Sequence, residues 1–326
     1  MKAVLCRAYG PPESLVVEEV PPLVAGPGEV VVSVKAASVN FPDVLIIQNK
    51  YQFKPPLPFS PGSEVAGVVK SVGEGVTAAK PGDRVMAFTT YGGFAEEVKT
   101  DATRLLPLPD GMDFTIASAF VLAYGTSDHA LRDRGGLEAG ETVLVLGAAG
   151  GVGIAAIEIA KAVGARVIAC ASRDDKLAVC REHGADETVN YQSEDLRERV
   201  KALTNGKGVD VVYDPVGGPY TETALRSCAW RGRLLVVGFA AGDIPKIPLN
   251  LTLLKGCSIV GVFWGEFARR EPTAFAASIA QLVRWHAEGK LRPHVSATFP
   301  LERASEALAL MAAREVKGKI VLVVGR

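Results

Sequence analysis

The part of the sequence that most constrains the fold lies near the middle of the chain, at residues 142–153, and reads TVLVLGAAGGVG. A β-branched and leucine-rich run leads into Gly147, and Gly150 and Gly153 follow at intervals of three residues. An apolar segment at residues 154–163 follows at once and has the composition of a buried helix. A strand, a glycine turn and a helix in this order form the arrangement that holds a dinucleotide pyrophosphate.

Each residue of this turn has an expected role. Gly147 permits a sharp turn, Gly150 lets backbone N–H groups approach the phosphates, and Gly153 lets the helix pack closely on the strand. Gly151 and Val152 lie where the helix N-terminus offers unpaired N–H donors and a partial positive charge to an anion. The spacing is G-x-x-G-x-x-G rather than G-x-G-x-x-G, so a glycine-rich buried turn without a ligand is the alternative interpretation.

The next strand favours a bound dinucleotide and indicates which one. Residues 165–171 predict a buried parallel strand, with residues 154–163 as its crossover helix. A site selective for NAD usually has Asp or Glu at the end of this strand, about 20 residues after the glycines. Here Ala171 stands at that position. The acid that would repel the 2′-phosphate of NADPH is therefore missing.

The residues that follow this strand supply groups that bind a phosphate. Ser172, Arg173 and Lys176 can make charge-assisted hydrogen bonds to a 2′-phosphate. The sequence therefore predicts NADPH as the cofactor. In the alternative interpretation these residues only cap the next helix, and Asp174 or Asp175 binds the ribose of NAD.

Length and charge limit the class of protein. The chain has 326 residues, enough for two domains, and its formal net charge is zero. This balance argues against nucleic-acid binding through a basic surface. The N-terminus carries no signal-peptide pattern, and the longest apolar tract, residues 142–160, contains four glycines, which makes it a poor membrane span. The five cysteines share no metal-ligand spacing, so we expect a cytoplasmic protein with reduced thiols and no membrane association.

The pattern of strands and helices changes near residue 117. Before it, short expected strands at residues 30–36, 64–72 and 84–87 are separated by Pro-Gly turns, which is typical of a compact, largely antiparallel β domain. A helix is expected at residues 117–132, and the alternation of strands and helices beyond it predicts a doubly wound parallel sheet. The expected strands of that sheet are residues 142–146, 166–171, 188–190, 209–214, 232–238 and 258–263. Helices at 272–288 and 302–313 precede a last strand at 319–324, which we expect to return to the first domain.

Several segments carry a family resemblance. Residues 38–43 read SVNFPD, residues 58–67 read PFSPGSEVAG, and residues 214–218 read DPVGG. With the glycine turn, they resemble the zinc-independent quinone oxidoreductase branch of the medium-chain dehydrogenase/reductase superfamily, and residues 54–59 and 261–265 are most like one subgroup of it. The resemblance covers the whole chain. It implies an α/β fold with a discontinuous GroES-like catalytic domain at residues 1–122, a Rossmann NADPH-binding domain at 123–266, and residues 267–326 returning to the catalytic domain.

The resemblance also implies where the cofactor binds, in the cleft between the two domains. Ser172, Lys176 and Tyr191 would surround the 2′-phosphate and adenosine. Thr126, Phe239, Phe263 and Trp264 would lie along the nicotinamide half. Arg173 joins this set on the charge argument alone.

The same resemblance implies no metal site. In the zinc alcohol dehydrogenases of this superfamily a cysteine stands at the position of Asn40 and a histidine at that of Ser63, whereas Glu64 is kept. Catalytic zinc needs about three N, S or O ligands, and the scattered histidines do not restore them. His129 is nearest to the expected cleft and is expected on a helix surface. Without a metal to lower the pKa of an alcohol, reduction of an electron-poor acceptor is the expected reaction.

The expected chemistry is hydride transfer from NADPH to a quinone or to a conjugated enone or enal. Asn40 is the first candidate to donate a hydrogen bond to the acceptor carbonyl, the alternative being a turn-forming residue that only shapes the loop. Tyr51 either protonates the product or shapes the pocket. Asp43 is expected to orient Asn40 or the loop backbone rather than to act as an acid. Leu45 stands where several relatives have a tyrosine, so the pocket is more apolar and water is a candidate for the final proton source.

Two other functions stay open at this point. A reductase of 2-enoyl thioesters would need a basic groove for a CoA phosphate, toward which Lys50, Lys54, Arg269 and Arg270 are weak hints. A non-catalytic NADPH-binding redox sensor would use the same fold. The expected partners are a small electrophilic acceptor and a second copy of the chain, because residues 258–263 would form an exposed apolar edge strand that pairs across a two-fold axis.

Overall fold

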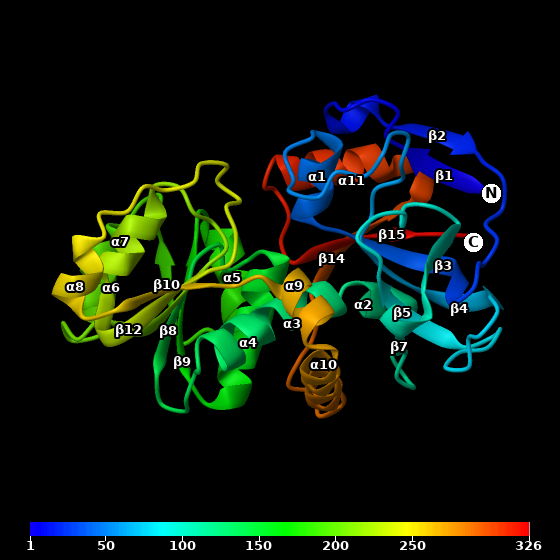
Figure 1. Cartoon of the computed structure of the whole chain (residues 1–326). Helices are drawn as coiled ribbons and strands as arrows, with labels where there is room; N and C mark the ends of the chain where they lie inside the picture. The colour runs from blue at the N-terminus through cyan, green and yellow to red at the C-terminus, as the bar shows by residue number, and fades with distance from the viewer. Residues whose placement is uncertain (326) are drawn as a thin grey trace. The chain divides into compact units, whose positions relative to one another are not determined.

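The structure is a computed structural model that describes residues 1–325, and its elements are labelled in Figure 1. The contacts divide the chain into two compact units. The first consists of Met1–Leu122 and the residues from Val295 onward, and the second is Ala123–His294. The first unit is therefore built from two separate segments of the chain, with the second unit inserted between them.

The first unit is built on a mostly antiparallel sheet. In spatial order its strands are β14 (Val295–Pro300), β15 (Lys319–Val323), β3 (Glu29–Val39), β4 (Glu64–Val72), β5 (Arg84–Phe88) and β7 (Leu105–Pro107), and β6 (Glu97–Asp101) also pairs with β3. Of these pairs, β14 with β15 is parallel and the others are antiparallel. β1 (Lys2–Leu5) and β2 (Val16–Glu19) form a separate antiparallel pair. Short 3₁₀ turns occur at Pro12–Ser14, Ala102–Arg104 and Leu301–Arg303.

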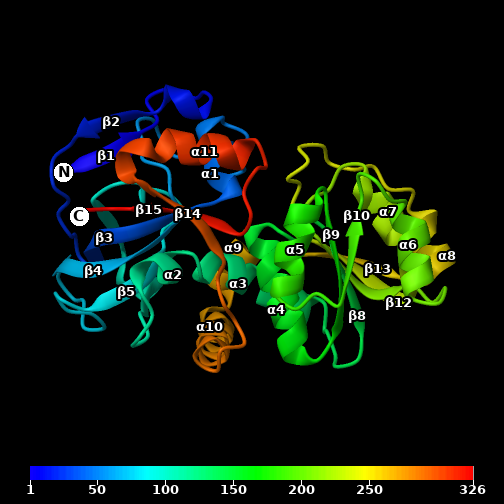
Figure 2. The same ribbon diagram turned by 180° about the vertical axis from the view of Figure 1, so that it is seen from behind.

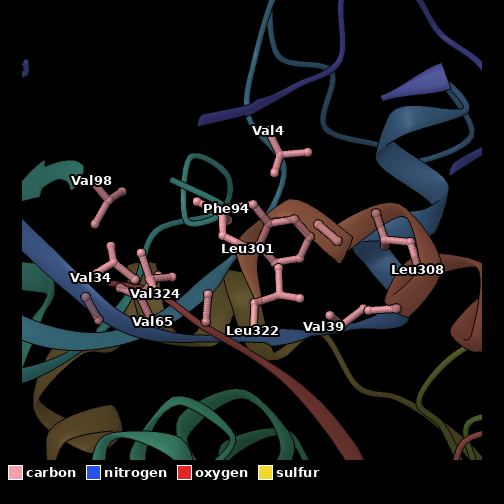
Figure 3. Close-up of a cluster of buried hydrophobic side chains, with 14 of the residues drawn as sticks. Val4, Val34, Val39, Val65, Phe94, Val98, Leu301, Leu308, Leu322 and Val324 are labelled. Atoms are coloured by element: carbon pink, nitrogen blue, oxygen red, sulfur yellow. The ribbon is translucent and has the colours of Figure 1, made fainter. Parts of the chain in front are cut away.

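Valines and leucines fill the core of this unit. Figure 3 shows Val34, Val39 and Val65 of the sheet together with Phe94 and Leu308, all of them buried. Helices α1 (Phe41–Ile47) and α11 (Ala304–Ala312) pack on each other and add side chains to the same core, and α2 (Phe114–Ser118) packs on β3 and β4. Because strand side chains alternate between two faces, burial of this set fixes the register of the strands.

The C-terminal strand joins the two segments at the far end of β3. β15 pairs with β3 so that Ile320 lies opposite Val39. On the other side of β3, Glu64 at the start of β4 lies opposite Ser38. The end of β3 is therefore flanked by the first residues of two other strands, which is the feature that builds the site described below.

The second unit is a parallel sheet of the Rossmann type. Its strands lie in the order β10 (Glu187–Asn190), β9 (Arg166–Ala171), β8 (Thr142–Val145), β11 (Val209–Asp214), β12 (Cys228–Val236) and β13 (Ser258–Gly261). Helices α6 (Leu196–Leu203), α7 (Tyr220–Arg226) and α8 (Asn250–Lys255) cover one face, and α4 (Gly151–Val163) and α5 (Asp174–Glu182) lie on the other, as Figures 1 and 2 both show. The strand order reverses between β8 and β11, and open α/β sheets bind ligands at the carboxyl ends of the strands near such a point.

Several boundaries differ from the sequence expectations. Residues 117–132 do not form one helix: α2 ends at Ser118, and α3 (Val121–Asp128) then continues into a π-helical turn, His129–Arg134. β14 has no expected counterpart, because its alternation of small polar and apolar residues is a weak strand signal. The sequence predicted that the chain returns to the first domain at residue 267, whereas in the structure the first unit resumes at Val295. The reason is that α9 (Trp264–Arg270) and α10 (Pro272–Ala287) pack on each other and belong to the second unit.

Within residues 1–325 no helix has the length and apolar character that a membrane crossing requires.

Candidate active site

The end of β3 places a cluster of polar side chains inside the first unit. Ser38, Asn40, Asp43, Glu64 and Lys319 are each at most 5% exposed. Ser38 and Asn40 lie two residues apart, the spacing that puts strand side chains on one face. Glu64 begins β4 and Lys319 begins β15, on the two sides of β3. Pairing of three strands therefore assembles the cluster from positions far apart in the chain.

Three hydrogen bonds and one ion pair close four of these side chains into a ring. Asn40 Nδ2 donates to Ser38 Oγ (3.0 Å), and Ser38 Oγ donates to Glu64 Oε2 (2.6 Å). Lys319 Nζ donates to Asn40 Oδ1 and lies 3.6 Å from Glu64 Oε2. The backbone N–H of Leu122 donates to the other oxygen of Glu64 (2.8 Å). Each charged group of the ring thus has a hydrogen-bonded or oppositely charged neighbour, as burial requires.

Asp43 holds the backbone of this segment. It is the third residue of α1, which begins directly after Asn40, and its Oδ2 accepts a hydrogen bond from the N–H of Asn40 (2.8 Å). A carboxylate here satisfies an amide that the helix leaves unpaired and faces the positive end of the helix dipole. Pro42 stands in the first turn, where its fixed φ favours a helix start. The structure therefore places Asp43 where it fixes the backbone of Asn40.

Burial changes the protonation of the cluster. It raises the pKa of Asp43 to about 7, although the N–H of Asn40 and the nearby Lys319 ammonium act in the opposite direction. Burial also lowers the pKa of Lys319, against the attraction of Glu64 and Asp43. Two acids and one ammonium share this buried space, so a proton on Asp43 leaves the Lys319–Glu64 pair electrically balanced. Asp43 therefore changes charge near neutral pH.

Tyr51 lies in the loop after α1, partly buried against the core to which α1 contributes. Burial and the carboxylate of Asp43 raise the pKa of its phenol, and a side-chain hydrogen bond with Gln52 acts in the opposite direction. The phenol is therefore protonated at neutral pH and is able to donate a hydrogen bond or a proton. The interaction with Asp43 shows that these two predicted residues lie near each other.

In the second unit the glycine turn requires glycine at two positions, Gly147 and Gly153. Gly147 has φ +57°, in the left-handed region. A Cβ on Gly153 would lie 2.5 Å from the carbonyl oxygen of Gly147, so α4 approaches the turn too closely for any side chain. Gly150 is the N-cap of α4, and Gly151 and Val152 begin its first turn. The backbone N–H groups of this first turn have no carbonyl acceptor within the helix. They are therefore suited to donate hydrogen bonds to a pyrophosphate.

The residues predicted to hold the adenosine end lie around the carboxyl ends of β9 and β10. Ser172 follows β9, and Lys176 stands in the first turn of α5; both are partly buried. Arg173 is the N-cap of α5, and its guanidinium donates two hydrogen bonds to Asp175, of 2.9 and 3.1 Å. Tyr191 follows β10 and packs against a tyrosine of α7, with ring centroids 4.4 Å apart. The structure thus brings these residues together and pairs Arg173 with a neighbouring acid.

The residues predicted for the nicotinamide half lie near the start of the second unit and after β13. Trp264 is 5% exposed and covers Gly125, on which a Cβ would lie 2.7 Å from the indole nitrogen. Thr126 is the next residue of α3 and is partly buried. Phe263, one residue before Trp264, is 55% exposed. Thr126 and Trp264 therefore belong to one packed region, and Phe263 presents its ring to solvent.

The DPVGG segment forms a tight turn at the end of β11. Asp214 accepts the N–H groups of Val216 (2.9 Å) and Gly217 (2.8 Å) through one oxygen and the hydroxyl of Thr221 (2.6 Å) through the other. These donors satisfy a carboxylate that is otherwise buried. Phe239, after β12, lines a pocket of about 170 Å³ with Asp214 and Thr221. Asp214 therefore shapes the turn beside the expected cofactor edge.

Sequence reasoning missed Lys319 and gave Ser38 no role. The available signal was weak: Lys319 is a charged residue at the head of an otherwise apolar strand, a pattern that also occurs on exposed strand ends. The expectation for His129 was wrong. Its ring is 6% exposed and stacks on Phe267, with ring centroids 4.2 Å apart, because α9 packs over the π-helical turn.

Comparison with known proteins identifies the family. The profile of the alcohol dehydrogenase GroES-like domain matches residues 26–110, and that of the zinc-binding dehydrogenase matches residues 151–282. The quinone oxidoreductase-like protein 2 homolog of Nematostella vectensis is 40% identical over 325 residues, which cover 98% of this chain and 88% of that protein. The chain belongs to the medium-chain dehydrogenase/reductase superfamily. This confirms the resemblance and the fold class predicted from the sequence.

Bacterial members of the medium-chain dehydrogenase/reductase superfamily are similar over the whole chain. The quinone oxidoreductase of Pseudomonas aeruginosa is 38% identical over 325 residues and 99% of both chains. The crystal structure of Escherichia coli quinone oxidoreductase complexed with NADPH superposes with a TM-score of 0.93 at 31% identity, covering 99% of this chain and 100% of that chain.

The name of the second profile refers to zinc, but the side chains at the corresponding positions of this protein do not form a zinc site. At the end of β3 the groups available are the amide of Asn40, serine hydroxyls and the carboxylate of Glu64. That carboxylate already accepts two hydrogen bonds, and the Lys319 ammonium, 3.6 Å away, would repel a dication. Across residues 1–325 no group of three or more His, Cys, Asp or Glu side chains is arranged to hold a metal ion. Of these groups, the amide of Asn40 and the serine hydroxyls can donate hydrogen bonds, and the carboxylate of Glu64 accepts them.

Proposed function

We propose that this protein is an NADPH-dependent, zinc-independent reductase that transfers hydride to a quinone or to a conjugated enone or enal. The observation that carries the proposal is the buried amide of Asn40, a hydrogen-bond donor held by Ser38 and Lys319, in a chain whose second unit has a glycine turn that leads into α4. The names of the relatives, quinone oxidoreductases, and the NADPH in the Escherichia coli structure support it.

In this reaction NADPH supplies the hydride. Negative charge develops on the acceptor oxygen as hydride arrives, and Asn40 Nδ2 donates a hydrogen bond to that oxygen. Asp43 fixes the backbone from which Asn40 projects. Tyr51, protonated at neutral pH because its pKa is raised, donates a proton to the product or closes the pocket, with water as the alternative proton source. Leu45 makes the neighbourhood apolar, which suits an uncharged acceptor.

The choice of NADPH over NADH is part of the proposal. Ala171 ends β9 where an NAD-selective site has an acid, and Ser172, Arg173 and Lys176 follow it. The first turn of α4 would hold the pyrophosphate, and Tyr191 would lie against the adenosine. Thr126, Phe239, Phe263 and Trp264 would border the nicotinamide. Because Arg173 already binds Asp175, a 2′-phosphate would compete with that carboxylate for the guanidinium.

A second copy of the chain is the proposed macromolecular partner. β13 is the last strand of its sheet, and its Ile259 is 38% exposed. Leu253 and Leu254 of the neighbouring α8 are 78% and 68% exposed. An apolar edge of this kind is suited to pairing with its own copy across a two-fold axis. We also propose a cytoplasmic location, for which the unpaired thiols give support.

The test is NADPH consumption by the purified, zinc-free protein with quinones, a conjugated enal, a conjugated enone and an enoyl-CoA, with NADH run in parallel. We expect turnover with NADPH on quinones or enones, and a loss of about 10²-fold in kcat for Asn40→Ala, which removes one donor to the developing oxyanion. Asn250→Ala, at an exposed position, is the matched control.

Other outcomes would overturn the proposal in different ways. Binding of NADPH without turnover on any acceptor would make the protein a redox sensor. Turnover confined to the enoyl-CoA would make it a thioester reductase, which the structure favours less, because Arg269 and Arg270 both pair with Glu266 instead of extending into a basic groove.

A further inference from the structure

We propose that Lys319 is a positioning residue for the reduction: it holds the carboxamide oxygen of Asn40, so that the amide nitrogen faces the acceptor as a strengthened donor. The inference rests on the proposed function, because it assigns the group that prepares Asn40 for its role. Nothing in the local sequence around Asn40 indicates this partner, which stands 279 residues further along the chain.

The orientation of the Asn40 amide follows from which groups can donate. An ammonium has only donors and an ionised carboxylate has only acceptors. Lys319 must therefore face Oδ1 of Asn40, and Ser38, which gives its proton to Glu64, must accept from Nδ2. Rotating the amide by half a turn would set Nδ2 against the ammonium and Oδ1 against the lone pairs of Ser38. The ring therefore permits one orientation of the amide.

The same contacts change the strength of the donor. The positive charge of Lys319 at Oδ1 draws electron density from the amide nitrogen and so makes Nδ2 a stronger hydrogen-bond donor. Burial makes this effect larger than in water, because the side chain of Lys319 is 5% exposed. The hydrogen bond from Nδ2 to Ser38 Oγ fixes the orientation of the amide. One Nδ2 proton is engaged by Ser38 Oγ, and the other has only a 3.4 Å contact with the carbonyl of Ser38. That second proton is the one we assign to the acceptor.

Charge balance accounts for the burial of a lysine at this position. Glu64 keeps Ser38 in its accepting role, and its buried charge requires a cation nearby. Lys319 supplies that charge from the start of β15 and reaches Asn40 with the same group. The raised pKa of Asp43 leaves Asp43 mostly uncharged below neutral pH, so it does not disturb the balance of this pair there. One side chain therefore both neutralises Glu64 and orients Asn40.

The experiment is a double-mutant cycle between Lys319→Met and Asn40→Ala, with kcat and the KM for the acceptor measured at saturating NADPH. We expect Lys319→Met to lower kcat by about 10- to 100-fold, somewhat less than removal of an oxyanion donor, and to leave NADPH affinity unchanged. In the Asn40→Ala background the same substitution should have no further effect on kcat, because it acts through the missing amide. Lys319→Arg keeps a donor-only cation and should recover most of the lost kcat.

Lys35→Met is the matched control, because Lys35 is an exposed lysine of the same sheet, on β3. It should leave kcat unchanged. The inference is overturned if Lys319→Met keeps the wild-type kcat, or if its effect is as large in the Asn40→Ala background as in the wild type. The second result would mean that Lys319 acts on stability or on another group.

A second measurement on the wild-type protein separates this inference from the proposed function. In protein labelled with ¹⁵N-asparagine, the Nδ2 protons of Asn40, assigned by their loss in Asn40→Ser, should be inequivalent, rigid and protected from solvent exchange. In Lys319→Met they should shift upfield and become mobile. A mobile, solvent-exchanging amide in the wild type would refute the positioning role even if the enzyme is active. A rigid amide that depends on Lys319 in a protein without turnover would refute the proposed function alone.

Discussion

The raised pKa of Asp43 makes a specific prediction about stability and pH. Burial raises this pKa to about 7 in the folded protein, whereas its ordinary value is 3.8. The folded state therefore binds more protons than the unfolded state at every pH between these values. The stability gained from this proton is fully present below about pH 4 and is lost as the pH rises through 7. At about 1.4 kcal/mol per pKa unit, a difference of about three units changes the free energy of unfolding by at most roughly 4 kcal/mol.

The perturbation is Asp43→Asn, which keeps an oxygen to accept the N–H of Asn40 and removes the titration. Between about pH 5 and about pH 8.5 the titration of Asp43 should lower the free energy of unfolding of the wild type by roughly 3 kcal/mol. The variant should not show this loss. Lys319 titrates with a lowered pKa, in the opposite sense, but it is present in both proteins. The free energy of unfolding should therefore fall more steeply with pH in the wild type than in the variant.

The assay is urea unfolding at constant ionic strength over this pH range, with the free energy taken from linear extrapolation. Asp110→Asn, at an exposed position of the same unit, is the control and should keep the wild-type slope. Equal pH slopes for the wild type and Asp43→Asn would refute the reasoning. A wild type that becomes more stable with rising pH relative to Asp43→Asn would show that the buried group is held as a carboxylate.

The remaining predictions concern the second unit. Replacing Arg173 and Lys176 together with alanine should weaken NADPH binding by at least about 100-fold, because each residue supplies a hydrogen bond to a charged group worth about 1.5–3 kcal/mol, and should leave NADH binding nearly unchanged. Equal loss of both in a fluorescence titration would show that the 2′-phosphate lies elsewhere. Gly153→Val should abolish NADPH binding and lower the melting temperature, because its Cβ would start 2.5 Å from a carbonyl oxygen; retained binding by calorimetry would mean that α4 has room to shift. Light scattering at micromolar concentration should give a dimer, and Ile259→Lys should weaken it. A monomeric wild type would contradict the role of β13. Lys201→Met, at an exposed position of α6, is the control and should leave the dimer unchanged.

Much of the second unit could be predicted because its signals are local. The strand, glycine turn and helix at residues 142–163 occupy one continuous stretch, and the structure gives β8 and α4 there. Strands 166–171 and 209–214 have the expected limits, since each is an apolar run bounded by turn residues. The single helix expected at residues 117–132 is divided in the structure. α2 ends at Ser118 and α3 begins at Val121, and α3 continues into the π-helical turn, where His129 stacks on Phe267 from α9, a distant part of the chain.

The sequence by itself determined the α/β class, the glycine turn, the absence of an acid at the last position of β9, and the presence of Asn40 and Ser63 in place of cysteine and histidine. Each of these depends on residue types within a few positions, where the geometry of turns and strands is fixed by local sterics. Only the tertiary structure decided what surrounds Asn40. Its partners come from β4 and β15, and strand pairing between segments far apart in the chain has no local signature in any of them. The register set by the buried core determines that Lys319, at the start of β15, faces the Asn40 amide.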